Sequence, residues 1–175
     1  MTKVYIRKAT IYDIDRMVQL IDQGKKLLAD QGIPQWQKGY PRREDLLEDI
    51  KRSWTYLLIF DQDIVGTATI FQLPDPNYAD IYQGKWQGDP QQKYATIHRI
   101  TIDPHFSGNH LGDYFFSDLI SEAYRLGYRQ LRIDTHVKNK RMQHLAAKFS
   151  FDYAGIIYLD HDDTDQRNAY QLFLS

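Results

Sequence analysis

Extended and helical hydrophobic patterns alternate through residues 95–151, and this order limits the folds that the chain can adopt. Residues 95–102 have the apolar alternation of a strand, and residues 111–126 carry apolar side chains three and four positions apart, as on one face of a helix. A second strand pattern follows at 131–137 and a second helical pattern at 139–149. Strand-helix-strand-helix order predicts a layered α/β fold with at least one parallel pair of strands.

The remaining segments predict further strands and short helices around this unit. The expected elements are a strand at 4–7, a helix capped by Thr10, a loop at 32–41, a helix at 43–52, a hairpin of strands at 55–60 and 64–71, and closing strands at 155–159 and 168–174. Residues 73–93 are rich in Pro, Gly, Asp and Gln and predict a long surface excursion, and such long loops are more often functional than idle. We expect one domain over residues 1–175 with a mixed sheet of about six to seven strands.

The strand at 95–102 contains a change of phase. Ala95 and Ile97 fall on one face, but Ile100 and Ile102 continue the alternation one residue late. One extra residue between His98 and Ile100 predicts a β-bulge there.

Composition narrows the class of protein. The chain is 42% hydrophobic and 26% charged, has a formal net charge of -1, and contains no cysteine. The hydrophobic and charged fractions are near the averages of globular proteins. The lack of cysteine excludes disulfides and thiolate metal sites, and the small net charge indicates neither a nucleic-acid nor a membrane partner. No stretch of about 18 apolar residues occurs, so we expect a soluble, cytoplasmic protein.

No metal site is expected either. The six histidines lack the H-E-x-x-H spacing of zinc proteases. The acidic segment 160–171 resembles a calcium loop, but Asp165 stands where glycine is required and Gln171 where the bidentate glutamate belongs. It therefore predicts an acidic turn between two strands.

The segment 103–112, DPHFSGNHLG, joins the bulged strand to the following helix. Gly108 can adopt a positive φ, and the amides at the start of a helix have no partner inside the helix. Together with the positive end of the helix dipole they form a site suited to phosphate. The alternative is a tight strand-to-helix turn that binds nothing.

Residues 95–151 resemble the central half of the GNAT superfamily of acyl-CoA-dependent N-acyltransferases. That family combines a strand, Asp/His-Pro, an aromatic residue, Gln/Arg-x-x-Gly-x-Gly/Ala, a helix, a strand, and an asparagine before a short helix. The order and spacing match from Ile100 to Phe151, and residues 1–94 carry the β-α-α-β-β lead of the family. The resemblance implies acetyl-CoA as acyl donor. It departs from the pattern at Ser107, in place of Gln or Arg, and at His110, in place of the middle glycine.

The resemblance also implies which residues hold the donor. Backbone amides of the bulged strand would pair with the pantetheine arm and polarise the thioester carbonyl, and the turn and an asparagine would hold the rest of the molecule. The implied residues are Ile100, Thr101, Ile102, Ser107, Gly108, Asn109, His110, Leu111, Gly112, Asp113 and Asn139. Asn139 has a structural role open to it as well, as the N-cap of the last helix.

The chemistry needs a base for the acceptor amine, because an ammonium has no lone pair. His98 is the candidate: a histidine exchanges its proton close to neutral pH, and related arylalkylamine acetyltransferases carry a histidine at a similar position. Its alternative role is that of a partly buried strand histidine. The family's usual acid, a tyrosine on the last helix, is replaced by Ala146; Tyr153 or Tyr158 could substitute, although packing is the more common role of such residues.

The acceptor should be recognised outside the donor-binding half. Trp36, Tyr40 and Trp86 lie in segments 30–56 and 73–93, where aromatic faces could bind an aromatic or cationic amine or could simply cover the sheet. We expect transfer of an acetyl group to a primary amine of a small molecule or a peptide terminus. The alternatives are another acyl group, or a non-catalytic acyl-CoA sensor or scaffold. Family habit alone points to a homodimer.

Overall fold

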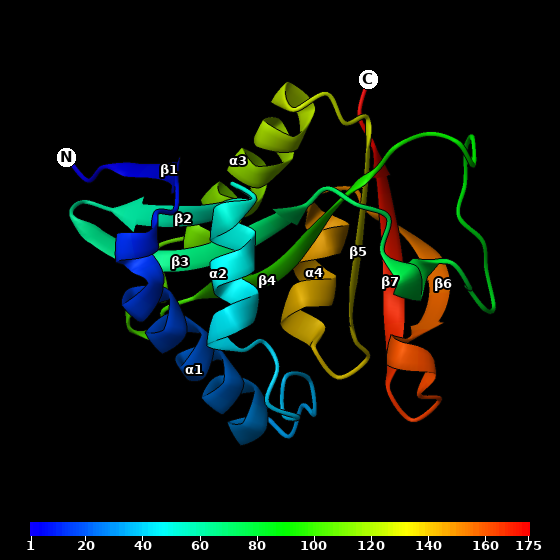
Figure 1. Ribbon diagram of the computed structural model, residues 1–175, viewed down its shortest axis with the longest axis horizontal. Coiled ribbons are helices and arrows are strands. Elements are labelled where there is room, and N and C mark those ends of the chain that lie inside the picture. The colour runs from blue at the N-terminus through cyan, green and yellow to red at the C-terminus, as the bar shows by residue number, and fades with distance from the viewer. The chain divides into compact units, whose positions relative to one another are not determined.

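A computed structural model describes residues 1–175 and contains seven strands and four α-helices (Figure 1). The strands are β1 (Val4–Lys8), β2 (Thr55–Phe60), β3 (Asp63–Phe71), β4 (Ala95–Ile102), β5 (Gln130–His136), β6 (Asp152–Tyr158) and β7 (Gln166–Phe173). The helices are α1 (Ile14–Asp30), α2 (Arg43–Lys51), α3 (Leu111–Arg125) and α4 (Lys140–Lys148). The strands form one mixed sheet, as the sequence predicted, and their order is β1-β2-β3-β4-β5-β7-β6.

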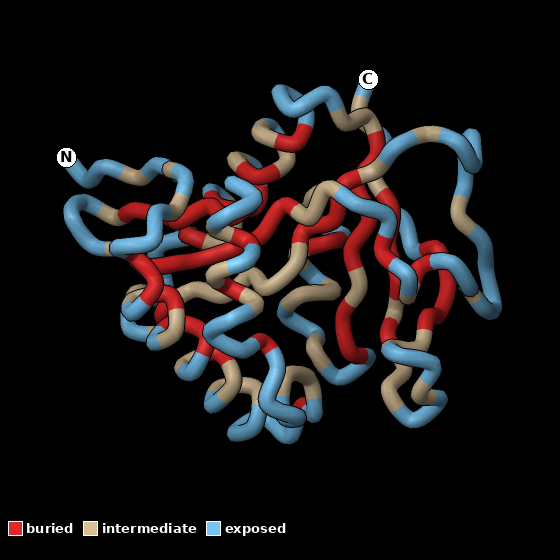
Figure 2. Tube along the Cα trace, viewed as in Figure 1, coloured by how far each residue is buried: buried red, intermediate tan, exposed pale blue.

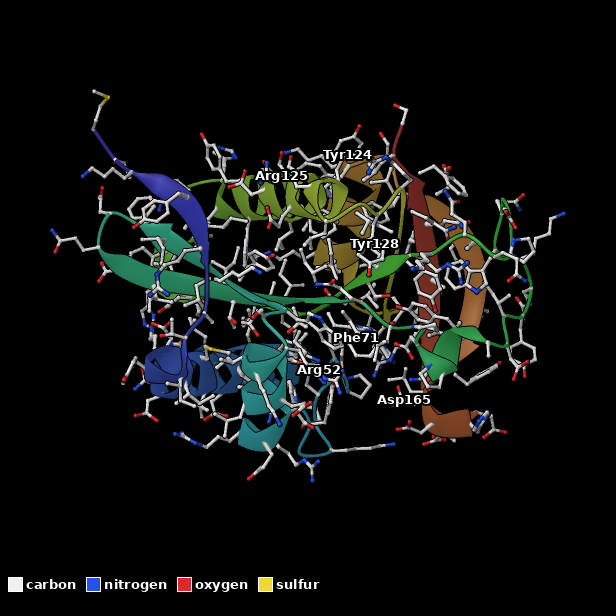
Figure 3. The ribbon with its side chains drawn as sticks, turned by 45° about the horizontal axis from the view of Figure 1, so that its top comes forward. Arg52, Phe71, Tyr124, Arg125, Tyr128 and Asp165 are labelled. Atoms are coloured by element: carbon white, nitrogen blue, oxygen red, sulfur yellow. The ribbon has the colours of Figure 1, made fainter.

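The chain divides into two compact units, and the first consists of Met1–Phe71 and Ile97–Ser121. Its strands β1, β2 and β3 are antiparallel neighbours, and β2 with β3 forms the expected hairpin. Figure 3 shows α1 and α2 on one side of these strands and α3 on the other. Because helices cover both faces, β2 is buried along nearly its whole length and reads as a continuous apolar run (Figure 2).

Two sets of contacts hold the helices of the first unit to its strands. On one side, Met17 and Ile21 of α1 and Leu46 of α2 form a core with Leu57 and Ile59 of β2. On the other side, α3 approaches β3 at a glycine: a Cβ on residue 66 would lie 3.2 Å from the ring of Phe115. A larger residue at this place would push the helix away from the sheet.

The backbone of β4 is irregular where the sequence predicted a bulge. Arg99 has a φ of 52°, in the left-handed region, in the middle of the strand. The parallel ladder between β4 and β5 is short, with the register Ala95–Leu131 and Thr96–Arg132. The residue with the unusual backbone, Arg99, lies between His98 and Ile100, where the alternation of the sequence changes phase.

The second unit consists of Gln72–Thr96 and Glu122–Ser175. Its strands β5 and β6 each pair with β7 in antiparallel register. The long excursion at 73–93 is anchored rather than loose. Tyr78 is buried, and Tyr82 exchanges two backbone hydrogen bonds of 2.8 Å with Ile156 of β6. None of the helices has the length and apolar composition that crossing a lipid bilayer requires.

Candidate functional site

The turn between β4 and α3 is held at its first residue. The carboxylate of Asp103 accepts hydrogen bonds from the His105 amide (3.0 Å), the His105 ring (2.7 Å) and Arg16 of α1 (2.7 Å). Burial acts to raise the pKa of this carboxyl, but the hydrogen bonds from Arg16 and His105 outweigh burial and lower it to about 2. Asp103 therefore stays ionised and ties the start of the turn to α1.

The same turn exposes a run of backbone donors. The amides of residues 108–112 have no hydrogen-bond acceptor within the protein, whereas the next two, of Asp113 and Tyr114, bond to the His110 carbonyl at 3.0 and 3.3 Å. Five consecutive free N–H groups thus precede and begin α3, a helix of 15 residues. The positive end of the helix dipole lies at the same place. Such an arrangement suits a phosphate or diphosphate group.

Backbone conformation explains how the departure from the family pattern at His110 is tolerated. Gly108 has a φ of 86°, and His110, at the position of the middle glycine, has a φ of 54°. Histidine is among the residues that adopt this region more readily, so the turn keeps its shape. A Cβ at Gly108 or at Gly112 would meet no atom within 4 Å, so the space beside both residues is open.

The other expected donor-binding residues lie within this run or close to it. Ser107 and Asn109 are exposed, and the Asn109 side chain donates to the Phe106 carbonyl at 3.0 Å. Leu111 is buried and anchors the first turn of α3. Ile100 and Ile102 on β4 are half-buried. These residues lie in one unit with the free amides, as expected, and their contacts with a donor stay predictions.

Two successive side chains of β4, His98 and Arg99, have partners on the side of α2. The His98 ring packs edge-on against Phe71, with centroids 5.7 Å apart, and Phe71 in turn packs on Trp54, which follows α2. Figure 3 labels Phe71 and also Arg52, the residue that directly follows α2. The guanidinium of Arg52 stacks on the ring of Trp54. Arg99 contacts Asp49 of α2 itself.

Two of the three predicted acceptor residues lie beside this strand. A Cβ at Gly24 of α1 would lie 2.6 Å from the Thr101 hydroxyl and 3.1 Å from the Trp36 ring, so these groups meet at the helix. Tyr40 accepts a hydrogen bond of 2.8 Å from Nε of Arg99, and its ring centroid lies 5.1 Å from that guanidinium. The loop before α2 therefore brings Trp36 and Tyr40 to the strand that carries His98.

Sequence reasoning missed the polar cluster at the centre of this arrangement. Asp49 is buried, contacts Nη1 of Arg99, and accepts a hydrogen bond of 2.9 Å from Thr69 of β3. One signal was available: Asp49 is a carboxylate between Leu46 and Ile50 on a short amphipathic helix, and a charge so close to the apolar face requires a partner. The identity of that partner could not be read from the sequence.

The cluster shifts the protonation of two members. Burial raises the pKa of Tyr40, although the nearby Arg99 acts against this. Burial acts to lower the pKa of Arg99, but Tyr40 and Asp49 outweigh it and raise the pKa above the usual value. At neutral pH the cluster consequently contains a phenol and a guanidinium.

The remaining candidates belong to the second unit. Asn139 caps α4, where its side chain accepts a hydrogen bond of 3.2 Å from the Met142 amide. The Trp86 indole donates to the Tyr78 carbonyl at 2.9 Å, and its ring lies 4.2 Å from the Arg132 guanidinium. Trp86 thus has structural partners in its own unit, and its role in acceptor binding stays a prediction.

The candidate proton donors on the last elements also have packing partners. Ala146 is fully buried on α4 and offers no hydroxyl. Tyr153 packs edge-on against Tyr170 and Tyr158 against Tyr82, with centroids 5.8 and 5.3 Å apart. This agrees with the packing role considered for both tyrosines.

Comparison with known proteins gives a consistent result. The model of the acetyltransferase (GNAT) family matches residues 21–151. A solved GNAT-family acetyltransferase from Streptococcus agalactiae is 34% identical, with 98% of this chain and 96% of that chain covered and a TM-score of 0.89. A structure described as an acetyltransferase from Staphylococcus aureus is 25% identical, with 97% and 99% covered and a TM-score of 0.72.

A more distant solved structure contains coenzyme A. The alpha-N-protein acetyltransferase RimL, in complex with coenzyme A, is 18% identical, with 98% of this chain and 94% of that chain covered and a TM-score of 0.70. At this identity the likeness concerns the fold alone. A search of curated protein sequences finds no match.

Proposed function

Because this chain belongs to the acetyltransferase (GNAT) family, we propose that it uses acetyl-CoA to acetylate a primary amine of a small molecule or a peptide terminus by direct attack on the thioester. The observation that carries the proposal is the run of five free amides at residues 108–112, at the start of α3. Few ligands other than a phosphorylated one match such a row of donors. The open space at Gly108 and Gly112 leaves room for it.

The chain's own residues would divide the work of binding the donor. The amides of residues 108–112 would hold its diphosphate, and the backbone of Ile100–Ile102 would pair with the pantetheine arm and donate to the thioester oxygen. Asn139 would contact the pantetheine arm through whatever hydrogen-bonding capacity its capping role leaves. Acetyl-CoA would supply the acetyl group in activated form, as a thioester.

His98 would remove the proton of the acceptor ammonium. It lies on the strand that would present the thioester and points to the same side as Arg99, where Tyr40 and Trp36 also lie. No acid at position 146 is required, because a free thiol ionises at a pKa of roughly 8.5 and can leave as the thiolate. The proposal thus needs one base and no dedicated acid.

The experiment has a binding arm and a turnover arm. Isothermal calorimetry should detect coenzyme A binding, and a thiol-release assay with acetyl-CoA should find turnover within a panel of amines. His98→Ala should lower kcat by roughly a hundredfold or more at neutral pH, the usual contribution of a general base. Added imidazole should restore part of this loss, since it can accept the proton in place of the side chain.

Three results would decide against parts of the proposal. If coenzyme A did not bind, the proposed donor site would be refuted. Binding without turnover of any amine would favour the second candidate, an acyl-CoA sensor or scaffold, to which the absence of a hydroxyl at Ala146 gives some support. Full activity of His98→Ala would assign the base to another group.

Several further expectations stay predictions. They are the choice of acetyl over another acyl group, the cytoplasmic location, the homodimer and the single domain over residues 1–175. Size-exclusion chromatography with light scattering would test the homodimer. A panel of acyl-CoA thioesters in the thiol-release assay would test the acyl group.

A further inference from the structure

We propose that Arg99 binds a carboxylate of the acceptor, so that the acceptor is a small amine that also carries a carboxylate, such as a free amino acid. The inference rests on the proposed function, because it names the substrate class of the same site. It begins with the position of Arg99, which follows the proposed base His98 directly on β4. A group bound by Arg99 would therefore lie close to the amine that His98 deprotonates.

The guanidinium of Arg99 has one nitrogen without a protein partner. Nε donates to the Tyr40 hydroxyl at 2.8 Å, and Nη1 contacts the Asp49 carboxylate. Nη2 makes no hydrogen bond to the protein, and 14% of the side chain remains exposed. Two N–H donors of a fixed cation are thus left for a ligand, and a carboxylate is the group that such a planar donor binds best.

The surrounding residues hold this guanidinium in place. Asp49 is itself fixed, because Thr69 donates to the same carboxylate oxygen that contacts Arg99. Arg99 adopts a φ of 52°, which is unfavourable for a residue with a side chain. Such backbone strain is found preferentially where a side chain must be aimed at a functional site.

The position of Tyr40 weakens the earlier idea that its ring binds a cationic amine. The ring centroid already lies 5.1 Å from the Arg99 guanidinium, so the aromatic face serves a cation of the protein itself. A second cation placed there would be repelled by the first. An anionic group beside Arg99 would instead be attracted.

The charges of the site favour an acceptor with both signs of charge. Arg99 and Asp49 cancel each other, so the pair presents a dipole rather than a net charge. A free amino acid carries a carboxylate and an ammonium and is likewise neutral overall. A polyamine would bring several positive charges to a pair of residues that has no net negative charge to compensate them.

Matched ligand pairs test the proposal by binding alone. Calorimetry on the protein saturated with coenzyme A would compare phenylalanine with 2-phenylethylamine and with phenylalaninamide, and methionine with 3-(methylthio)propylamine. Because the hydrogen bond to Arg99 is charged and partly buried, each amino acid should bind about tenfold to a hundredfold more tightly than its partner without the carboxylate. Equal affinities, tighter binding of the decarboxylated or amidated partner, or no binding by any of these ligands would overturn the proposal.

One substitution and a matched control assign the effect to Arg99. Arg99→Lys keeps the positive charge beside Asp49 but removes the second nitrogen, and it should abolish most of the preference for the carboxylate. Arg43 lies on α2, as Asp49 does, and forms an exposed ion pair with Asp15 of α1. Arg43→Lys removes this guanidinium and should leave the preference unchanged. An unchanged preference in a folded Arg99→Lys variant would refute the assignment. The ligand pairs above need no variant, so a folding defect in Arg99→Lys leaves the proposal testable.

Turnover separates this inference from the proposed function. For carboxylate acceptors Arg99→Lys should raise KM and leave kcat nearly unchanged, because the contact binds the ground state and the transition state alike. Acetylation of simple amines without any preference for carboxylates would overturn the inference and leave the proposed function standing. Tight binding of the carboxylates without acetylation would overturn the proposed function and leave the carboxylate-binding role of Arg99 standing.

Discussion

At the scale of single residues, the turn before α3 depends on what its side chains leave free. Gly112 is the fifth residue of the run of free amides, and a Cβ there would meet no protein atom within 4 Å. The side chain of a larger residue would therefore enter the space next to those donors without disturbing the core. A substitution of Gly112 can therefore change ligand binding without changing the stability of the fold.

Gly112→Val should weaken coenzyme A binding and leave the fold intact. The branched side chain would crowd a phosphate held by the neighbouring amides, at a cost of about tenfold or more in Kd. Valine is a better helix former than glycine, so the melting temperature should not fall. Calorimetry and thermal unfolding measure the two effects.

Ser117→Val serves as the control for this change. Residue 117 is exposed on the same helix, beyond its first turn, and is not among the expected donor contacts. Its affinity for coenzyme A should equal that of the unmodified protein. An unchanged Kd for Gly112→Val would show that the donor's phosphates do not lie against this turn.

At the scale of elements, Asp103 joins the turn between β4 and α3 to α1. It accepts from Arg16 and from two groups of His105, and Arg16 also donates to the Ile64 carbonyl of β3 at 2.9 Å. Asp103→Asn would remove the ion pair and weaken these bonds. We expect a loss of about 1 to 3 kcal/mol in the free energy of unfolding at neutral pH.

The pH dependence of this loss has a definite sign. The pKa of Asp103 is about 2 in the folded protein, below the ordinary value of a carboxyl group. Its contribution is therefore complete above the ordinary pKa and declines as the pH falls toward about 2. Urea unfolding at a series of pH values should show the difference between the two proteins shrinking from about pH 4 downward. A difference that stays constant over this range would mean that the carboxylate charge is not responsible.

Patterns within one element made much of the fold predictable from the sequence. The phase change around His98 predicted an irregular backbone, and Arg99 there has a positive φ. The position of Asn139 before an apolar helical pattern predicted a cap, and its side chain caps α4. The glycine spacing at 108 and 112 predicted where amides would be free. In each case the local geometry depends on neighbouring residues, which a sequence displays directly.

Contacts between distant segments could not be predicted in the same way. Arg99 and Asp49 are 50 positions apart, and their pairing depends on how α2 packs over the sheet, where it contacts α1 and β2. From the sequence alone it was not possible to tell which of the aromatic residues Trp36, Tyr40 and Trp86 would lie near β4. The structure brings the first two to β4 and gives Trp86 partners on the second unit's own elements.

At the scale of the whole molecule, charge is nearly balanced. The chain has 22 lysines and arginines against 23 aspartates and glutamates, and its formal net charge is -1. Such a protein exerts little long-range attraction on an anionic ligand such as coenzyme A. Affinity would then have to come from short-range contacts, of which the uncharged amides at 108–112 are the proposed ones.

This origin of affinity predicts a weak dependence on salt. Binding through lysine and arginine side chains displaces counterions and weakens steeply as salt rises, whereas backbone amides carry no counterions to displace. Raising the salt concentration from about 50 to 200 mM should therefore change the Kd for coenzyme A by less than about threefold, compared with a thousandfold or more for proteins that bind many phosphates through basic side chains. Calorimetry at several salt concentrations gives the slope directly. A steep slope would mean that basic side chains, rather than the turn before α3, supply most of the phosphate binding.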